Sequence, residues 1–388
     1  MKVLLIGSIF RHSSFSGVNI NLISELYKAG VDIKFLWTNR DMSLEESIKE
    51  YCPWKQDEIE IFKNILISEN DLKNHFFDFA IYFLVDPKFN KKRDNVKASK
   101  HIFYTVWSHI NFPLEWNDYF RVFDMIFTPS EANAHSLRIN GIDSIVIPHG
   151  IDDKIFNIDN LQNKDNERCK FLMCNSICNF KGADISINAF MQEFNNDDMV
   201  ELLIQTTSQK RSGNNIHDHH GEYYREYIDI LNKYPLKQLH TYYRSQSMNH
   251  EDMAKLYKSA NCVLSVHRGD GFGLVPLEAI SCGIPTITTN AHGPQTYLSA
   301  FYPYFVRGNI DWTSRLSGRH HFPDGGAENE VYMYYEPDVF EVRKKMRMVY
   351  EEWKNKLINP EKISSFIYSG FKYSDIAKMI KGVLENAL

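Results

Sequence analysis

Short apolar runs alternate with amphipathic stretches along the whole chain. The apolar runs suit buried strands, and the stretches between them suit helices. In the first part of the chain they predict strands at Lys2–Gly7, Val31–Trp37, Phe79–Leu84, His101–Trp107, Phe123–Thr128 and Ser144–Ile147. A helix is predicted to begin after Thr128, where Ser130 and Glu131 are typical of a capped start.

A polar segment from Asp152 to Arg168 interrupts this alternation and predicts a connection between two domains. Beyond it the pattern begins again. It predicts strands at Lys170–Asn175, Val200–Gln205, Cys262–His267 and Ile284–Thr289, and helices after Gly182, around Glu278, near Val342–Trp353 and over Ile363–Leu388. Strands that alternate with helices form parallel sheets covered by helices on both faces.

The 388 residues are too many for one ordinary compact domain and suit two of middle size. We therefore predict an α/β protein with two Rossmann-like, doubly wound domains. The first covers 1–160 and the second 165–365, and a C-terminal helix at about 368–388 packs back on the first. In such sheets ligands bind beyond the carboxyl ends of the strands.

Composition narrows the class of protein. Apolar residues make up 43% of the chain, which suffices for two cores, and the formal charge of −5 argues against a general nucleic-acid binder. No apolar run reaches the roughly 18 residues of a membrane-spanning helix. The N-terminal run MKVLLIGSIF suits a buried strand better than a signal peptide. The six cysteines are scattered, which indicates a reducing, cytoplasmic location.

The stretch HRGDGFGLVPLEAISCGIP, at His267–Pro285, has the strongest chemical pattern. It follows a predicted strand, passes through a glycine-rich turn and enters a helix at about Leu274. Glycines let the backbone approach a ligand closely, and a helix start directs N–H groups and partial positive charge at the turn. This combination suits a diphosphate. Asp270 and Glu278 can accept hydrogen bonds from sugar and ribose hydroxyls, although an ordinary strand–turn–helix fits the glycines equally well.

The same stretch resembles the acid–seven–Glu motif of glycosyltransferase family four, whose usual form is close to EGFGLPxLEAMAxGxP. Asp270 occupies the first acidic position, one methylene shorter than the usual Glu, and Glu278 occupies the second. The other matching residues are Gly271, Phe272, Gly273, Leu274, Leu277, Ala279, Gly283 and Pro285. In that family the second acid holds the ribose hydroxyls of a nucleotide-sugar donor. The first acid and the amides of the glycine turn approach the transferred sugar and the phosphates.

A second likeness lies in CNSICNFKGAD, at Cys174–Asp184, which is similar to the family's GRLxxxKGxD segment. Lys181 matches the lysine that neutralises the leaving diphosphate. Ser176 stands where the family has an arginine, so one cation of a pair is missing, and Arg268 in the neighbouring turn would supply a second charge. The alternative for Lys181 is a solvated lysine before a helix.

Weaker likenesses extend over most of the chain. IPHGID, at Ile147–Asp152, is similar to the segment that ends the family's first domain, and YTVWSHINFPLEW, at Tyr104–Trp116, resembles a subgroup with the pattern WExxxxPxxW. Ser108 replaces the subgroup's Glu. His109 beside it is a candidate contact for the donor sugar, although a lone histidine is as often structural. Gly17, in the first strand–helix turn, is either a phosphate contact or a simple helix-entry residue.

The resemblance implies the GT-B fold, in which two Rossmann-like domains face a cleft, and a retaining hexosyl transfer that needs no metal and no cofactor. The donor is a GDP- or UDP-sugar, with a slight preference for GDP. The acceptor is a hydroxyl group of a glycan, a lipid-linked or a protein-linked molecule. Three alternatives remain open: a non-catalytic or partner-dependent subunit, a nucleotide-sugar epimerase of similar architecture, and a Rossmann dehydrogenase. The missing G-x-G-x-x-G fingerprint disfavours the last.

Three other groups of residues have both an ordinary and a functional interpretation. Lys88–Lys100 is rich in basic residues and predicts either a solvated face or peripheral contact with an anionic membrane. His217–His220 is rich in metal-binding side chains, but adjacent residues rarely converge on one ion. Cys174 and Cys178 suit buried thiols better than a zinc site. We expect no metal site in the chain.

Overall fold

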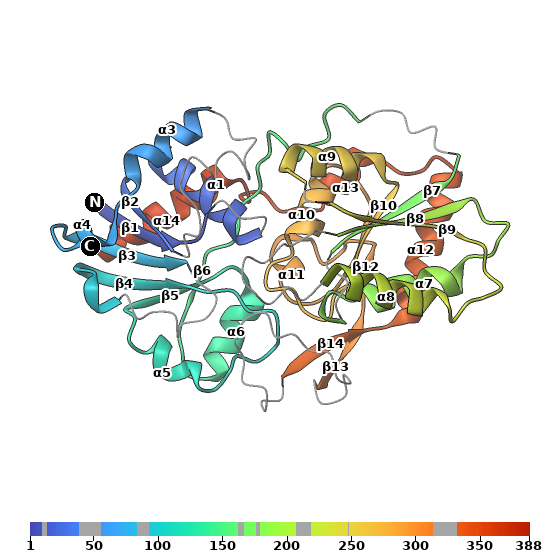
Figure 1. The fold of residues 1–388 in the computed structure, drawn as a ribbon, viewed down its shortest axis with the longest axis horizontal. Helices are drawn as coiled ribbons and strands as arrows, with labels where there is room; N and C mark the ends of the chain where they lie inside the picture. Colours follow the sequence, from blue (N-terminus) through green and yellow to red (C-terminus); the bar gives the residue numbers. More distant parts are fainter. Residues whose placement is uncertain are drawn as a thin grey trace. The chain divides into compact units, whose positions relative to one another are not determined.

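The computed structural model describes residues 1–9, 14–38, 56–83, 93–161, 167–175, 179–206, 219–246, 248–312 and 332–388. The chain divides into two compact units (Figure 1). Unit 1 consists of Met1–Asp152, His321–Tyr332 and Ser369–Leu388, and unit 2 consists of Asp153–His320 and Met333–Tyr368. Within the described ranges, no helix is long and apolar enough to cross a membrane.

Unit 1 is built on a six-stranded parallel sheet in the order β2-β1-β3-β4-β5-β6. Its strands are β1 (Lys2–Gly7), β2 (Asp32–Trp37), β3 (Phe77–Phe83), β4 (Ala98–Tyr104), β5 (Met125–Thr128) and β6 (Ile145–Val146). All six strands expected from the apolar runs are present. β4 ends before the predicted Trp107, because the side chain of Asn133 takes over the backbone groups of Trp107: Trp107 N–H donates to Oδ1 at 3.0 Å, and Nδ2 donates to Trp107 O at 2.8 Å.

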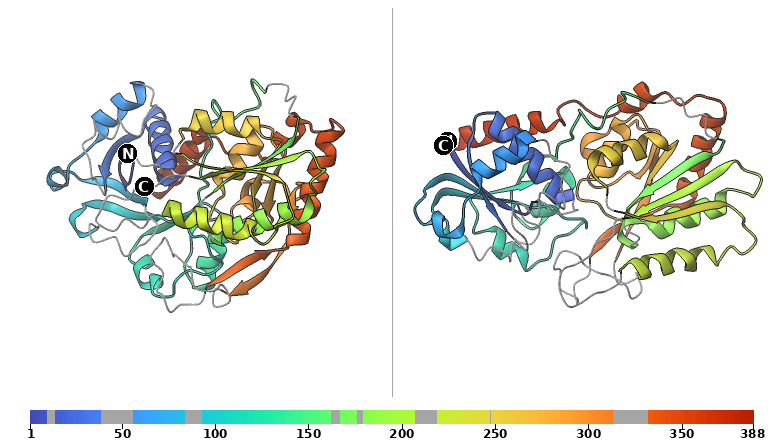
Figure 2. Two further views of the ribbon diagram at one scale, coloured as in Figure 1. Left: turned by 45° about the vertical axis from the view of Figure 1, so that its right-hand side comes forward. Right: turned by 45° about the horizontal axis from the view of Figure 1, so that its top comes forward.

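Helices cover the sheet of unit 1, and the last of them comes from the end of the chain. They are α1 (Ser14–Lys28), α3 (Gln56–Ile65), α4 (Glu69–Leu72), α5 (Trp116–Phe120), α6 (Glu131–Ile139) and α14 (Tyr373–Ala387). α14 packs along α1 (Figure 2). The predicted start of α6 is confirmed, since the Ser130 hydroxyl accepts the N–H of Asn133 at 3.3 Å.

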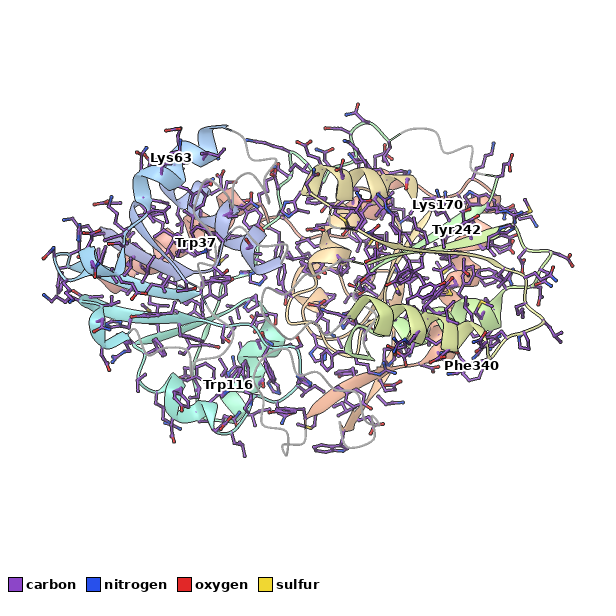
Figure 3. The ribbon with its side chains drawn as sticks, in the orientation of Figure 1. Trp37, Lys63, Trp116, Lys170, Tyr242 and Phe340 are labelled. Atoms are coloured by element: carbon purple, nitrogen blue, oxygen red, sulfur yellow. The ribbon has the colours of Figure 1, made fainter. Side chains whose placement is uncertain are left out.

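The core of unit 1 is strongly aromatic. Trp107, Trp116 and Phe120 are buried next to one another after the carboxyl end of β4. Trp116, which is labelled in Figure 3, has no exposed surface. Tyr332 joins this group, with its ring centroid 5.7 Å from that of Trp107. The high content of Phe, Tyr and Trp in the sequence is therefore used in packing.

Unit 2 is built on a second six-stranded parallel sheet in the order β12-β11-β10-β7-β8-β9. Its strands are β7 (Cys169–Cys174), β8 (Val200–Thr206), β9 (His240–Ser245), β10 (Cys262–Ser265), β11 (Thr286–Thr289) and β12 (Phe305–Val306). Counted from the first strand of the unit, the order is 3-2-1-4-5-6, which is that of a Rossmann dinucleotide-binding domain. The predicted fold class is therefore confirmed in both units.

The helices of unit 2 are α7 (Ala183–Glu193), α8 (His219–Leu231), α9 (His250–Ser259), α10 (Leu274–Ser281), α11 (Pro294–Tyr297), α12 (Val339–Lys354) and α13 (Pro360–Ser364). An antiparallel hairpin of β13 (Gly308–Trp312) and β14 (Met333–Pro337) is added to the unit. Sequence patterns did not predict this hairpin, nor the strands β9 and β12, nor the helices α8, α9 and α11. The helix predicted over Ile363–Leu388 was wrong in its continuity, because the chain leaves the helix after α13, and Gly370 has a positive φ of 95° before α14 begins.

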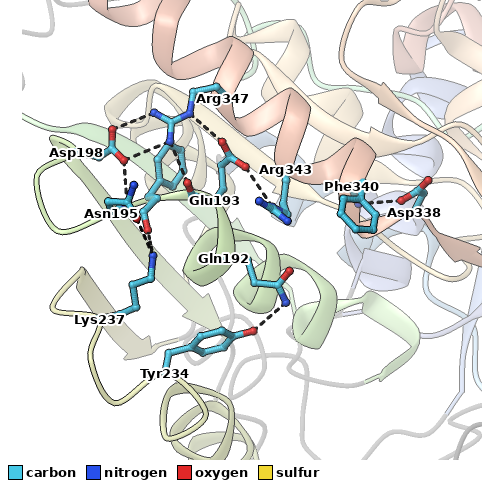
Figure 4. A network of polar contacts seen from close by, with 11 residues as sticks. Gln192, Glu193, Asn195, Asp198, Tyr234, Lys237, Asp338, Phe340, Arg343 and Arg347 are labelled. Carbon is cyan, nitrogen blue, oxygen red and sulfur yellow. Dashed lines mark hydrogen bonds and ion pairs between the residues drawn. The ribbon is translucent and has the colours of Figure 1, made fainter.

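α12 is fastened to α7 by a polar network (Figure 4). The guanidinium of Arg347 donates to Glu193 at 2.9 Å and to Asp198 at 2.9 Å, and it lies 4.8 Å from the ring centroid of Phe194. Arg343 donates to the other oxygen of Glu193 at 3.2 Å. The network satisfies its charges internally, so we regard it as structural.

Candidate active site

The order of strands in unit 2 reverses between β7 and β10, which are neighbours in the sheet. In open parallel sheets a crevice forms at such a switch point, beyond the carboxyl ends of the two strands. The segment after β7 contains Lys181, and the segment after β10 contains Asp270. The sheet order therefore brings together two residues that are 89 positions apart in the chain.

Gly182 makes the approach of these two segments possible. Its φ is +63°, and a Cβ added there would lie 2.1 Å from the carbonyl oxygen of Val266. The N–H of Arg268 donates to Phe180 O at 2.9 Å across the same contact. As a result the Nζ of Lys181 reaches Asp270, and its distance to Oδ2 is 2.8 Å.

Asp270 organises the glycine turn as well as pairing with Lys181. Its Oδ1 accepts the N–H groups of Gly273 at 2.9 Å and of Phe272 at 3.4 Å. Burial opposes the charge, but Lys181 and His267 beside the carboxyl group hold the pKa of Asp270 at about 2. The side chain is therefore an anion at neutral pH.

The glycine turn leads into α10 through Gly273, whose φ is +81°. The hydroxyl of Tyr297 donates to Gly273 O at 2.6 Å and holds the turn in place. The amides of Leu274 and Val275 lie in the first helical turn, where the helix supplies no acceptor. A helix start of this kind attracts anions.

Glu278 lies one turn further along α10 and is half-buried. The hydroxyl of Tyr257 donates to its Oε2 at 2.9 Å. Burial raises the pKa of Glu278 to about 7. The thiol of Cys174, at the end of β7, is close enough for this carboxyl group to contribute, after burial, to raising the pKa of Cys174. Glu278 is thus placed at the switch point, and Tyr257 is a site residue that sequence reasoning missed.

Arg268 is buried and bonded to two carboxylates. Its guanidinium donates to Asp184 at 2.8 and 2.9 Å and to Glu336 at 2.6 and 3.0 Å. These bonds tie the turn after β10 to the first turn of α7 and to β14. The KGxD-like segment includes Asp184, so the sequence offered a hint of its contact with Arg268. No sequence pattern predicted the contact between Arg268 and Glu336.

Two buried histidines flank the glycine turn, and sequence reasoning missed both as site residues. His267 is fully buried and His292 is 4% exposed. Their ring centroids are 6.2 Å apart. Burial lowers the pKa of His267 to about 3 and that of His292 to about 4, so both rings are neutral at neutral pH.

Two other predicted site residues, His109 and Gly17, belong to unit 1. His109 is buried in unit 1, with its ring between those of Trp107 and Tyr332 at centroid distances of 5.0 and 4.9 Å. The prediction that Gly17 lies in the turn between the first strand and its helix was wrong, because α1 begins at Ser14 and Gly17 is a half-buried residue within it. Ser176 lies outside the described residues.

The IPHGID segment is held within unit 1. His149 is buried, with Nδ1 3.2 Å from the hydroxyl of Tyr104, which also donates to Ile147 O. A Cβ on Gly150 would lie 2.4 Å from the ring of Tyr373, the first residue of α14. Glycine is therefore required where the end of the chain packs against this turn.

An open pocket of about 400 Å³ lies beyond the carboxyl end of β9 in unit 2. The segments of Lys181 and Asp270 follow the carboxyl ends of β7 and β10 in the same sheet. It is lined by Arg244, Gln246, Met248, Asp252, Lys255 and Leu256. Gln205, at the end of β8, donates to Gln246 O at 2.7 Å and is paired in register with Cys174. The pocket and Glu278 therefore lie along one line of strand ends.

The other predicted groups are only partly described. In Lys88–Lys100, the structure describes Arg93–Lys100, where Lys97 donates to Lys73 O at 3.0 Å and Lys100 donates to Ala387 O. Cys178, His217 and Asp218 lie outside the described residues, as do the side chains of His219 and His220. Within the described part of the chain, no three His, Cys, Asp or Glu side chains are grouped to hold a metal.

Comparisons with known proteins bear on the fold and on part of unit 2. Residues 155–313 match the family model described as glycosyl transferases group 1, which covers the switch point of unit 2. The chain is similar to a glycosyltransferase from Rickettsia africae, with 13% identity, a TM-score of 0.67 and coverage of 99% of this chain and 98% of that one. No curated protein sequence matches the chain at a significant level.

Two further similar structures contain a nucleotide. One is HepE from Anabaena in complex with UDP, with 12% identity, a TM-score of 0.65 and full coverage of both chains. The other is the pneumococcal O-GlcNAc transferase GtfA with UDP and GlcNAc, with 12% identity, a TM-score of 0.61 and coverage of 100% and 99%. These likenesses show the fold: two Rossmann-like units of the GT-B type, as the sequence predicted.

Proposed function

We propose that the protein is a retaining glycosyltransferase that transfers a hexosyl unit from a nucleotide sugar to a hydroxyl acceptor. The observation that carries the proposal is the meeting of Lys181, Asp270 and the start of α10 at the switch point of unit 2. A cation, a carboxylate and a helix start together suit a sugar diphosphate. The family match over 155–313 supports the same assignment.

Lys181 and the amides of α10 stabilise the leaving diphosphate. Negative charge builds on this group as the glycosidic bond to it breaks, so preorganised donors lower the transition state more than the ground state. Without donor, the charge of Lys181 is balanced by Asp270 at 2.8 Å. Asp270 in turn accepts hydrogen bonds from the transferred sugar, in the role of the first acid of an acid–seven–Glu motif.

Glu278 holds the ribose, and the pocket beyond β9 holds the base. Carboxylate oxygens accept hydrogen bonds from vicinal hydroxyls, and the Tyr257 hydroxyl orients Glu278. The pocket lies two strands away from β7, or about 10 Å at the usual strand spacing. That separation suits a nucleoside whose diphosphate lies at the switch point. UDP and GDP are both compatible with it.

We further propose that unit 1 binds the acceptor, which is a glycan, a lipid-linked or a protein-linked molecule. His109 and Gly17 of unit 1 remain candidate contacts for the donor sugar and its phosphate, and Lys88–Lys100 is a candidate for peripheral contact with an anionic membrane surface of the cytoplasm. The reaction needs no metal or cofactor, because Lys181 and the helix amides supply the electrostatic stabilisation. Undiminished turnover in EDTA would be the expected result.

One observation favours a second candidate, a non-catalytic or partner-dependent subunit. Arg268 was expected to compensate for Ser176, yet its guanidinium is bonded to Asp184 and Glu336. We therefore assign Arg268 a structural role, which leaves Lys181 as the cation of the proposed site. Nucleotide release from sugar nucleotides, measured with and without acceptors, distinguishes the two candidates. An epimerase would interconvert the donors and release no nucleotide.

The first experiment is a thermal-shift series with UDP, GDP and ADP. A ligand that binds only the folded state raises the melting temperature. We expect one of the three to raise it by several degrees at about a hundredfold excess over its Kd. If none of them does, and calorimetry also detects no binding, the proposed donor site is wrong.

A further inference from the structure

His292 lies in the segment between β11 and α11 and has an unusual backbone conformation. Its φ is +59°, in the left-handed region that only a few per cent of non-glycine residues adopt. Such residues persist where the surrounding structure determines them, and they are enriched at ligand sites. Glycine would fit this backbone without strain, so the presence of a histidine requires a reason.

The imidazole ring is the second unusual feature. It is 4% exposed, and its Nε2 has no hydrogen-bond partner among the described residues. The carbonyl of Arg268 lies on its other side, and the ring of Tyr335 meets it edge-on at 5.6 Å. Buried polar atoms nearly always have a partner, so an unpaired nitrogen here points to one that binds during function.

The backbone next to His292 is fixed to the glycine turn. Gly293 N–H donates to Asp270 O at 3.1 Å, and a Cβ on Gly293 would lie 2.1 Å from the carbonyl carbon of Phe272. There is no room for the two segments to slide past each other. Any group bound at the carboxylate of Asp270 is therefore within the neighbourhood of the His292 ring, which also senses the charge of Asp270.

We infer that His292 determines specificity for the donor sugar: one hydroxyl of the sugar ring donates a hydrogen bond to its Nε2 while another donates to Asp270. The inference rests on the proposed function. In a neutral imidazole one nitrogen donates and the other accepts, so a ring that bonds the carbonyl of Arg268 through its N–H offers Nε2 as an acceptor, and a sugar hydroxyl can donate to it. Because burial keeps the ring uncharged, it offers a phosphate no ion pair, and a sugar hydroxyl is the better match.

The test uses two variants that the backbone tolerates. His292→Gly removes the ring and relieves the positive φ, and His292→Asn keeps a hydrogen-bonding side chain that accepts this conformation. The matched control is Lys356→Gly, because Lys356 is an exposed residue of unit 2 with a φ of 56°. All three should melt no lower than the wild type.

Binding is measured by calorimetry with UDP, GDP and ADP, and with UDP-glucose, UDP-galactose, GDP-mannose and ADP-glucose. For the nucleotide that the wild type binds, single-deoxy analogues of the best sugar are added. We expect His292→Gly to bind the nucleoside diphosphate within about twofold of the wild type and the sugar nucleotide about five- to tenfold more weakly, the effect of one neutral hydrogen bond. It should also lose discrimination against one deoxy analogue. His292→Asn should recover part of both, and Lys356→Gly should change neither.

Three results would overturn the inference. If His292→Gly matches the wild type with every sugar nucleotide and deoxy analogue, the ring contacts no sugar hydroxyl. An equal loss for the diphosphate and the sugar nucleotide would instead locate the effect at the phosphates or the loop backbone. A wild type that binds no nucleotide at all would overturn the proposed function, and this inference with it, so the two failures are distinguishable.

Discussion

The switch points of the two sheets differ sharply in chemistry although both units are doubly wound. In unit 2, the ends of β7 and β10 are followed by a lysine, a carboxylate and a glycine turn that are bonded to one another. In unit 1, the reversal lies between β1 and β3, where a Cβ on Gly7 would lie 2.9 Å from Asn19 Nδ2 and 3.3 Å from Phe83 O. In the described residues of unit 1, closely packed atoms therefore fill the space at the end of β1.

The difference teaches that an architecture offers a site and that side chains decide whether chemistry is placed there. At the carboxyl ends of β3 and β4 in unit 1, the described side chains make packing contacts: the rings of Phe83 and Tyr104 are in contact, and the Tyr104 hydroxyl is hydrogen-bonded to His149. Charged and neutral polar groups are concentrated at the edge of unit 2, and three buried ring nitrogens of His267 and His292 have no partner there among the described residues. Substitutions at the two edges should therefore have different consequences.

The largest expected effect is on turnover. Lys181→Ala should lower kcat by about 10²–10³, because it removes one preorganised charge from the leaving diphosphate. Lys170→Ala is the control, since Lys170 is also a partly buried lysine of unit 2 and pairs with Glu201 at 3.4 Å. Steady-state release of nucleotide measures both. Near wild-type turnover in Lys181→Ala with intact donor binding would remove the distinction between the two edges.

Gly182→Ala should be the most destabilising substitution of this set. The added Cβ would lie 2.1 Å from Val266 O, and the φ of +63° is unfavourable for alanine. We expect a loss of about 3 kcal/mol or more in the free energy of unfolding. Gly30→Ala in unit 1 has a similar φ of +77° but open space around it, and should cost about 1 kcal/mol. Equal losses in urea denaturation would contradict the close approach.

Glu278 should make the stability of unit 2 depend on pH. Burial raises the pKa of Glu278 from 4.5 to about 7, so the folded chain retains a proton that the unfolded chain releases. The free energy of unfolding should then fall as the pH rises from about 4.5 to about 7, by at most about 1.4 kcal/mol per pH unit. In Glu278→Gln this component should disappear, and the variant should gain stability relative to the wild type across that window. A constant difference between the two proteins from pH 5 to pH 8 would show that the carboxyl group is solvated.

The same variant also tests the ribose contact. Glu278→Gln should bind the nucleotide about tenfold more weakly at pH 8, because a hydrogen bond to an ionised group is lost. Unchanged affinity in calorimetry would count against this role.

The smallest effect is expected at the edge of unit 1. Tyr104→Phe removes hydrogen bonds to Ile147 O and His149 Nδ1, which should cost about 1 kcal/mol of stability. Donor-nucleotide affinity should not change. If nucleotide binding weakened in this variant while the melting temperature stayed constant, unit 1 would contribute to the donor site and the contrast between the two edges would be wrong.

Local sequence determined much of this protein. The apolar runs predicted where most of the strands lie along the chain, and Ser130 predicted the start of α6, because buried strands and helix caps need particular residues at short spacing. The glycine turn with Asp270 was also predicted as a unit, since its hydrogen bonds join residues three positions apart or fewer. β9 and the hairpin of β13 and β14 were missed. In β9 (HTYYRS), exposed and partly buried residues alternate, and no apolar run marks the strand.

Only the tertiary structure decided which partners the polar groups have. Arg268 lies beside the predicted turn, yet it is bonded to Glu336, 68 positions away, and to Asp184, 84 positions away. Tyr257 reaches Glu278, and His267 meets His292, through contacts between separate segments. A residue pattern reports the periodicity of its own segment, whereas these contacts depend on the order in which the sheet arranges the strands. For that reason the sequence indicated the segment for which we propose a nucleotide-sugar site, and the fold determined which side chains lie beside it.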